Sequence, residues 1–408
     1  MNTMTEPLDN PVAYLCQRVR QFVDTQIIPN EAVLAAGDDK ATTLAAKLSS
    51  LARQAGLFGS FYPRGHGGTV TRLADYLRIA EEEGRSEFGP AILGADATLD
   101  AHMLFWHGSP EVRQRYFEPL VNGEAVCSYA MTEPDSIGSI PDTIRSRAQW
   151  KDKHWVLNGR KWFVCRSLQA DFVTVVARTS DKPVEQGLSM LVVPADAEGF
   201  ERGRALPVLG RDQGQGEVSF TNVVVPADHV LGVPGHGISM MQQRLGLGRI
   251  LRSCQWLGMA QRSFELMCER IHSPRGVMAR LPEKQLVRAR VCDVYRHLAA
   301  ARALLLDAAQ KFDDRIPNSV EVNVAKLAAA DAFSVATDNG IQIMGAEGLS
   351  DWTPLSDLYR HARATHILDG TDDALTSSVG RTILDNSRDP SAFDSHFPSV
   401  LRKAGAHD

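Results

Sequence analysis

A central segment with the sequence pattern of β-strands lies between two segments with helical periodicity. This order constrains the fold more than any other feature of the 408-residue chain. Apolar residues recur every three or four positions from about residue 11 to residue 121, and again from Gly237 onward. Between these segments, β-branched runs end in Pro, Gly or Asp, as strands do at turns. We therefore expect an α+β fold with separate helical and β regions.

The predicted organisation has three folded parts and a tail. We expect an N-terminal helical domain over residues 1–125, a β-domain over residues 126–236, a C-terminal four-helix bundle over residues 237–388 and a tail over residues 389–408. A chain of 408 residues exceeds what one hydrophobic core usually supports. The tail contains two prolines and several small polar residues, so we expect it to be loosely ordered.

Local signals predict several turns and helix ends. Asn158-Gly159 stands between apolar runs and strongly predicts a hairpin turn, because both residues readily adopt positive φ. The β-domain is therefore expected to be antiparallel and barrel-like. Residues 63–68 are rich in Gly and Pro and should break the first helical region. Residues 318–321 resemble a capping box, with Asn318 as the cap of a helix through Ala336.

Composition excludes several classes of function. The net charge is −5 and no basic run is present, which argues against nucleic acid as a partner. No apolar stretch reaches the roughly 18 residues that span a bilayer, and residues 1–10 lack a secretory apolar core. Six scattered cysteines include no Cys-x-x-Cys pair, so neither zinc nor a disulfide framework is indicated. We expect a cytoplasmic protein without a metal, in which His361 and His366 are surface or packing residues.

Asp369 is the most informative single residue. It is a lone carboxylate directly before Gly370, after a segment with helical spacing of apolar positions. A carboxylate there can act as a base at the mouth of a pocket, with the glycine allowing close approach of the backbone. The alternative is that Asp369 only caps the following helix, which is a common role for Asp.

Several separate segments agree in order and spacing with one known family. They are residues 129–134, 138–139, 158–161, 342–345 and 359–360. Together they resemble the acyl-CoA dehydrogenase family of flavoproteins from about residue 10 to about residue 385. In most of that family, a glutamate that removes the substrate α-proton stands where Asp369 stands. With residues 244–250, the chain is similar to a smaller subgroup that has aspartate at this position.

The resemblance implies an acyl-CoA dehydrogenase-like fold that binds FAD. Thr132 and its neighbours would contact the flavin pyrimidine ring, unless Glu133-Pro134 is only a turn. Phe163 would shield the reactive face, and Cys165 would replace a Thr or Ser that donates to flavin N5. A small packing residue is the alternative role of Cys165. The implied cofactor-binding residues are Tyr129, Met131, Thr132, Ser139, Phe163, Cys165, Arg275, Gln342, Gly345 and Thr371.

The same resemblance implies substrate-binding roles for Ser139, Arg249 and Gly370. Some relatives carry their base one residue before the arginine, but Gly248 stands there and cannot take a proton. Asp369 is then the only candidate at the two known base positions. Gly246 and Gly248 would weaken a helix by about 1 kcal/mol each, so either close approach of a ligand or tight helix packing is expected there.

These features predict an FAD-dependent α,β-dehydrogenation of an acyl thioester carried by CoA or an acyl-carrier protein. The resemblance also implies a homodimer or homotetramer and electron-transfer flavoprotein as a possible partner. One alternative is a flavin oxidase of the same fold, similar to nitroalkane oxidase. The other is a degenerate, non-catalytic flavoprotein, since Cys165, Ala346 and residues 273–281 depart from the usual family pattern.

Overall fold

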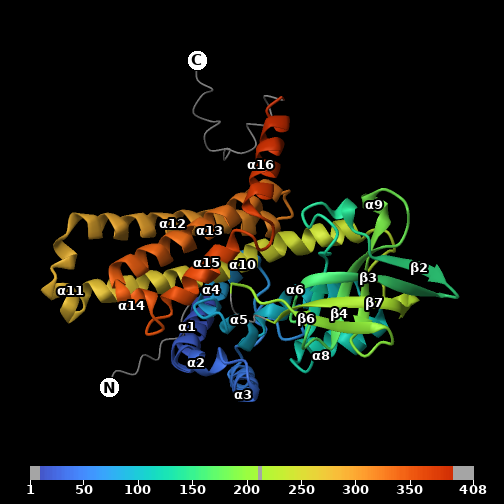
Figure 1. Cartoon of the computed structure of the whole chain (residues 1–408), viewed down its shortest axis with the longest axis horizontal. Coiled ribbons are helices and arrows are strands. Elements are labelled where there is room, and N and C mark those ends of the chain that lie inside the picture. Colours follow the sequence, from blue (N-terminus) through green and yellow to red (C-terminus); the bar gives the residue numbers. More distant parts are fainter. Residues whose placement is uncertain (1–9, 210–213, 389–408) are drawn as a thin grey trace.

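The computed structural model describes residues 10–209 and 214–388. Helices form one end of the molecule and a curled β-sheet forms the other, with α10 running from the helices to the sheet (Figure 1). The α+β order expected from the sequence is therefore confirmed. The tail expected to be loosely ordered, residues 389–408, lies outside the described residues.

The first helical region is made of short helices in close succession. Asn10 caps the first of them by accepting hydrogen bonds from the N–H groups of Val12 and Ala13. The α-helices are α1 (Pro11–Phe22), α2 (Glu31–Leu34), α3 (Asp39–Gln54), α4 (Leu73–Glu83), α5 (Gly89–Ile92), α6 (Thr98–His107), α7 (Pro110–Val112) and α8 (Glu118–Val121). Single π or 3-10 turns join them at η1 (Val23–Ile27), η2 (Ile28–Asn30), η3 (Ala95–Ala97) and η4 (Arg113–Phe117). The predicted break at residues 63–68 lies between α3 and α4.

The middle region is a seven-stranded sheet in the order β1-β4-β2-β3-β7-β6, with β5 paired to β4. The strands are β1 (Cys127–Ala130), β2 (Arg147–Lys151), β3 (His154–Cys165), β4 (Phe172–Arg178), β5 (Leu188–Pro194), β6 (Phe200–Ala205) and β7 (Gln215–Pro226). Short helical turns are η5 (Pro141–Thr143), α9 (Val184–Gly187) and η6 (Ala227–His229). Most pairs are antiparallel, as expected, but β1 runs parallel to β4, and β2 meets β4 in parallel at one position.

The hairpin prediction at Asn158-Gly159 is wrong. Both residues lie inside β3, at an irregularity in its pairing with β7. The turn between β2 and β3 is formed by Asp152 and Lys153, which both have positive φ. Gly159 is needed for a different reason, because a Cβ there would lie 2.2 Å from Oγ of Ser146.

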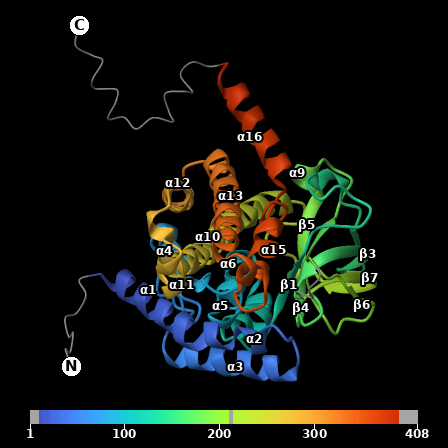
Figure 2. The same cartoon turned by 60° about the vertical axis from the view of Figure 1, so that its left-hand side comes forward.

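The C-terminal region is built on three long helices, α10, α12 and α13, together with shorter ones. The helices of this region are α10 (Gly237–His272), α11 (Pro274–Met278), α12 (Gln285–Asp313), α13 (Ser319–Met344), α14 (Ala346–Leu349), α15 (Leu355–Thr365) and α16 (Asp372–Asn386), with the 3-10 turn η7 (Leu281–Glu283). α16 projects away from the other helices (Figures 1 and 2). α13 begins where predicted, but Asn318 makes no capping bond and instead donates from Nδ2 to the carbonyl of Ala308.

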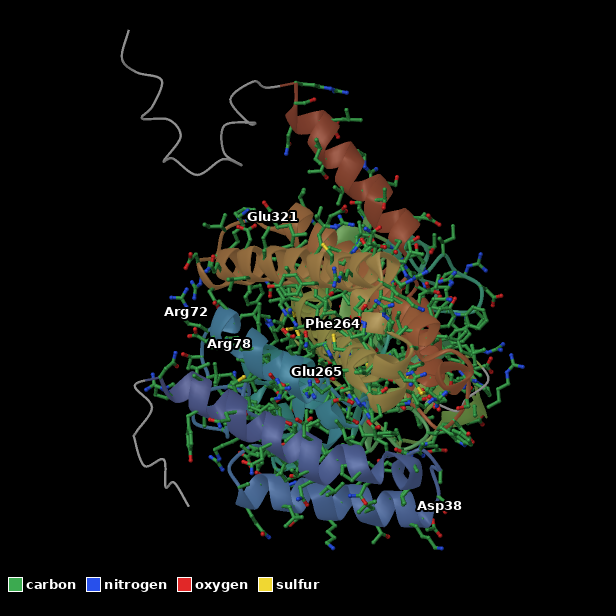
Figure 3. The ribbon with its side chains drawn as sticks, turned by 90° about the vertical axis from the view of Figure 1, so that its left-hand side faces the viewer. Asp38, Arg72, Arg78, Phe264, Glu265 and Glu321 are labelled. Atoms are coloured by element: carbon green, nitrogen blue, oxygen red, sulfur yellow. The ribbon has the colours of Figure 1, made fainter. Side chains whose placement is uncertain are left out.

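One hydrophobic core connects the N-terminal helices with the C-terminal bundle. Buried residues of α1 and α4 belong to the same cluster as those of α10, α12 and α13. Ion pairs reinforce the contact, because Glu265 of α10 accepts from Arg85 at 2.8 Å and from Arg20 at 3.1 Å. Glu265 lies where α10 passes the N-terminal helices (Figure 3). A second cluster joins α6 and α8 to the sheet.

α10 packs against the end of α4 with its backbone. A Cβ on Gly258 of α10 would lie 2.0 Å from the Glu81 carbonyl oxygen, and a Cβ on Gly84 would lie 2.2 Å from that of Gln255. Only glycine permits such an approach. On the same helix, a Cβ on Gly248 would lie 3.2 Å from Leu99, which supports the packing role for that glycine, whereas Gly246 faces open space.

The different surroundings of Gly258 and Gly246 on α10 give a pair of contrasting predictions. Gly258→Ala should lower the free energy of unfolding by about 1–3 kcal/mol, because backbone atoms cannot move aside cheaply. Gly246→Ala, in the same helix, should leave stability unchanged or raise it by up to about 1 kcal/mol through helix propensity. Chemical denaturation of both variants measures the difference, and equal effects would contradict the close-packing interpretation.

Among the described residues, none of the helices combines the length and apolar character needed to cross a membrane.

Candidate active site

The candidate base lies in the short connection between α15 and α16. Asp369 has φ of 56° and Gly370 has φ of 103°, so the chain reverses sharply before α16. The cap of α16 is Thr371, whose side chain accepts from the Ala374 N–H. The helix cap, which was the alternative role for Asp369, is therefore supplied by Thr371, and the carboxylate of Asp369 is not a helix cap.

Two cations, the half-buried Arg249 and the fully buried Lys326, hold the carbonyl groups of this connection. Arg249 of α10 donates from Nε to the Asp369 carbonyl at 2.8 Å and from Nη1 to Oδ1 of Asn323 at 3.0 Å. Lys326 of α13 donates to the Gly370 carbonyl at 3.0 Å and pairs with Asp372 at 2.6 Å. Burial lowers the pKa of Arg249. Arg249 thus supports the backbone of Asp369, and its contact with substrate stays a prediction.

A histidine completes the support of the connection. Nδ1 of His366 lies 2.5 Å from Oδ2 of Asp372, and its Nε2 lies 2.7 Å from Oγ of Ser334. His361 lies 6.1 Å from the ring of Phe333, between ring centroids. His361 thus contacts Phe333, whereas His366 has a polar role that the sequence analysis did not predict. Among the described residues, no group of three or more His, Cys, Asp or Glu side chains could hold a metal ion.

The hydrogen bonds from Arg249 and Lys326 to the two carbonyl groups leave the carboxylate and the N–H of Asp369 without a role in holding the backbone. The residue is half-buried. Within residues 10–209 and 214–388, neither its carboxylate nor its backbone N–H has a hydrogen-bond partner. One group can accept a proton and the other can donate a hydrogen bond, and both belong to a residue whose position is fixed. This combination suits a general base beside an oxyanion-binding donor.

The segment after β1 is joined to a bulge in β3. Thr132 Oγ1 donates to the Trp162 carbonyl at 2.8 Å, and the Trp162 N–H donates to the Thr132 carbonyl at 3.1 Å. Lys161, fully buried, donates to the Met131 carbonyl and to Glu133, both at 2.8 Å. Glu133 also accepts the N–H groups of residues 145 and 146, so it anchors this segment and is more than part of a turn.

The bulge presents an aromatic ring and a thiol. Phe163 is 46% exposed and has φ of 50°, an unusual backbone for an aromatic residue. Two residues later, Cys165 is exposed, so the structure does not support a packing role for its side chain. Although part of the side chain is accessible to solvent, the protein packed around the thiol disfavours the thiolate and raises the pKa of Cys165. Arg252, Arg166 and Asp369 are among the charges that act on it. The charge of Asp369 is one of those that raise this pKa.

A charged cluster that sequence reasoning missed lies beside these residues. Arg244 of α10 pairs with the buried Asp100 of α6 at 2.9 Å, and its guanidinium lies 3.8 Å from the ring centroid of Tyr129. Arg166 lies 3.9 Å from Asp100. The Tyr129 hydroxyl is buried without a partner among the described residues, and burial raises its pKa. The participants come from distant segments, so no local sequence signal marks them.

Other predicted residues lie elsewhere. Arg275 pairs with Glu347, next to a depression of about 560 Å³ at the α11 end of the bundle, opposite the sheet (Figure 1). Gln342 is exposed, and Gly345 ends α13 with φ of 72° and ψ of −139°, a conformation available essentially only to glycine. Ser139 is exposed in the segment between β1 and β2. The structure thus divides the predicted cofactor residues into two separate groups.

Comparison with known proteins matches the chain in three consecutive parts. Family models described as the N-terminal, middle and C-terminal domains of acyl-CoA dehydrogenase match residues 13–124, 128–223 and 235–384. FadE2 of Mycobacterium tuberculosis, named a probable acyl-CoA dehydrogenase, is 32% identical over 367 residues, which cover 87% of this chain and 89% of that protein.

Two further comparisons define the extent of the likeness. Acyl-CoA dehydrogenase family member 11 of Pongo abelii is 30% identical over 82% of this chain, and the chain spans only 44% of that longer protein. A solved structure from Mycobacterium abscessus, assigned to the acyl-CoA dehydrogenases, superposes with a TM-score of 0.82 at 28% identity, covering 92% of this chain and 98% of that one. With its full series of domains matched in order, the chain belongs to the acyl-CoA dehydrogenase family.

Proposed function

We propose that this protein catalyses the α,β-dehydrogenation of an acyl thioester, carried by CoA or an acyl-carrier protein, with FAD as cofactor and Asp369 as base. One observation carries the proposal. The carbonyl of Asp369 is held by Arg249, while its carboxylate and its N–H have no partners among the described residues. A residue fixed in this way can place an acceptor for the α-proton and a donor to the thioester carbonyl on the same substrate.

The residues of the β3 bulge fit a flavin. Members of the family are FAD-dependent. Phe163 and Cys165 are both exposed and lie two residues apart on β3, which supports a flat ring system lying against them. Thr132 and Met131 would hold its polar edge, because their segment is anchored by hydrogen bonds to β3. When bound, FAD supplies the acceptor for the hydride that leaves the β-carbon.

The chain's own residues account for the proton step. The Asp369 carboxylate removes the α-proton, and its backbone N–H donates to the thioester oxygen as negative charge develops there. Arg249 and Lys326 keep the backbone in place through bonds to two carbonyl groups. Aspartate is one methylene shorter than glutamate. We therefore infer that this chain belongs with the relatives that have aspartate as base and that the substrate approaches the backbone of Asp369 more closely.

The predicted cofactor residues that lie far from the β3 bulge support the proposal that the protein is an oligomer. Acyl-CoA dehydrogenases are oligomeric. Arg275, Gln342 and Gly345 lie at the opposite end of the bundle from Phe163, so we propose that they bind the adenosine-diphosphate part of FAD held by a second copy. Exposed apolar side chains nearby, Met278, Leu286 and Trp352, suit contact with that copy. Electron-transfer flavoprotein is the proposed electron acceptor.

The assembly and cofactor proposal predicts a yellow oligomer with about one FAD per chain. Arg275→Ala should lower the FAD content of the oligomer, because a charge-assisted contact to the pyrophosphate is lost. Arg288→Ala, at an exposed arginine of α12, is the matched control. Absorbance and light scattering measure both properties. A colourless monomer that takes up no added FAD would contradict the proposal.

Cys165 provides a test of the flavin position. Cys165→Thr should maintain or raise the rate of flavin reduction, since a hydroxyl is a stronger hydrogen-bond donor than a thiol. Stopped-flow measurement with a reactive acyl-CoA gives the rate. If the variant loses its flavin instead, Cys165 does not face N5 and the assumed register of β3 is wrong.

Asp369→Asn should slow flavin reduction by about 10²–10⁴-fold, because the amide keeps the shape but cannot accept the proton. Flavin content and melting temperature should change little. Asp373→Asn, at an exposed carboxylate on the first turn of α16, is the control and should behave as wild type. Asp369→Glu should also be slower, because the longer side chain overfills a site shaped for aspartate.

The assay is anaerobic titration with a panel of acyl thioesters while flavin absorbance is followed. A near-normal rate for Asp369→Asn would remove this residue from the mechanism. Reduction followed by rapid peroxide formation in air would favour the oxidase alternative over the dehydrogenase.

A further inference from the structure

The backbone of the candidate base has a conformation that needs support from outside the turn. Asp369 has φ of 56°, in the left-handed region that residues with a Cβ disfavour. Arg249 donates to the Asp369 carbonyl at 2.8 Å, and Lys326 donates to the Gly370 carbonyl at 3.0 Å. Because these carbonyl groups belong to consecutive peptide units, the two bonds together fix the backbone on the C-terminal side of Asp369.

Lys326 depends on one counter-ion for its position. Its side chain is fully buried on α13, and Nζ lies 2.6 Å from Oδ1 of Asp372. Among the residues that the structure describes, no other carboxylate lies within ion-pair distance of this ammonium. A buried ammonium without an anion is strongly unfavourable. The place of the Lys326 charge, and with it the bond to the Gly370 carbonyl, therefore follows the carboxylate of Asp372.

The carboxylate of Asp372 is held in turn by His366. Nδ1 of the imidazole lies 2.5 Å from Oδ2 of Asp372, and the N–H of Asp372 donates to the His366 carbonyl at 3.0 Å. A carboxylate only accepts hydrogen bonds, so Nδ1 carries a proton whether the ring is neutral or charged. Side chain and backbone of His366 thus both bind Asp372, and they close the turn that contains Asp369.

Ser334 fixes the other edge of the imidazole. Its Oγ lies 2.7 Å from Nε2 of His366, and the hydroxyl has no other partner among the described residues. The order hydroxyl, imidazole, carboxylate resembles that of hydrolytic triads, in which the carboxylate orients the ring. Here the serine lies in the interior of α13, where backbone N–H groups bond to the preceding turn and cannot form an oxyanion hole. The arrangement therefore orients the imidazole and does not make Ser334 a nucleophile.

Resting on the proposed function, we propose that His366 is a positioning residue for the base. The imidazole sets the place of the Asp372 carboxylate, the carboxylate sets that of the Lys326 ammonium, and the ammonium holds the Gly370 carbonyl. His366 touches neither substrate nor flavin in this scheme, and it neither gives nor takes the α-proton. Its effect is to keep the Asp369 carboxylate within reach of that proton, since rates fall steeply when reacting groups are displaced.

Two substitutions separate the roles of the ring nitrogens. In His366→Asn the amide nitrogen can take the place of Nδ1 and still donate to Asp372, whereas in His366→Gln it takes that of Nε2 and Asp372 loses this donor. At saturating acyl-CoA, His366→Gln should slow anaerobic flavin reduction about 10–100-fold, and His366→Asn should recover most of the lost rate. The acyl-CoA concentration that gives half the maximal rate should change little in either variant, because the contacts with substrate are retained.

His297→Gln is the matched control and should reduce flavin at the wild-type rate. His297 of α12 has 27% of its side chain exposed, against 23% for His366, and it also contacts an aspartate, Asp293. A role in stability alone would lower the melting temperature and flavin content of His366→Gln without slowing the molecules that retain flavin. Equal rates per bound flavin in wild type and both His366 variants would overturn the proposal and leave the proposed function intact. Failure of the wild type to reduce its flavin with any thioester would refute the proposed function.

Hydrogen–deuterium exchange tests the same contacts without turnover or flavin. The N–H of Asp372, which donates to the His366 carbonyl, reports on opening of the turn. In a peptide covering residues 366–375, exchange should be faster in His366→Gln and near wild type in His366→Asn and His297→Gln. Unchanged exchange in His366→Gln would show that the imidazole does not hold the turn, and it would overturn the proposal whatever the activity of the wild type.

Discussion

The close contact between α10 and α4 is the constraint on which the rest of the structure depends. At Gly84 and Gly258 the two helices meet through backbone atoms, which fixes the path of α10 between the N-terminal helices and the bundle. The same helix then passes the sheet and carries Arg244, Arg249 and Arg252 on successive turns. A change in its position would move the charged cluster, the support of Asp369 and the contact with the sheet together.

The candidate site separates positioning from chemistry. Arg249 and Lys326 bind the carbonyl oxygens of Asp369 and Gly370, so the sharp turn before α16 is held without using the Asp369 carboxylate. Positive φ at both residues makes this turn possible, and Thr371 supplies the cap of the next helix. The carboxylate and the N–H of Asp369 remain available because other groups satisfy the demands of the fold.

Sequence patterns predicted the features that depend on local chemistry. Helical and strand periodicity placed the helix–sheet–helix order, because burial of one face repeats every few residues in any packed element. Local motifs were less reliable where distant parts of the chain intervene. Asn158-Gly159 resembles a hairpin turn, yet the close approach of Ser146 requires the glycine inside β3. Asn318 resembles a helix cap, yet its amide donates to the end of α12.

The sequence by itself determined the family resemblance, the helix and strand segments and the choice of Asp369 as candidate base, since residue types and short spacings carry those signals. Only the tertiary structure decided what surrounds that base. Arg249 reaches Asp369 across 120 residues of sequence, and Lys326 reaches Gly370 across 44. Such contacts depend on how helices and sheet pack, and an arginine in a helix has the same local sequence whether it faces solvent or a carbonyl.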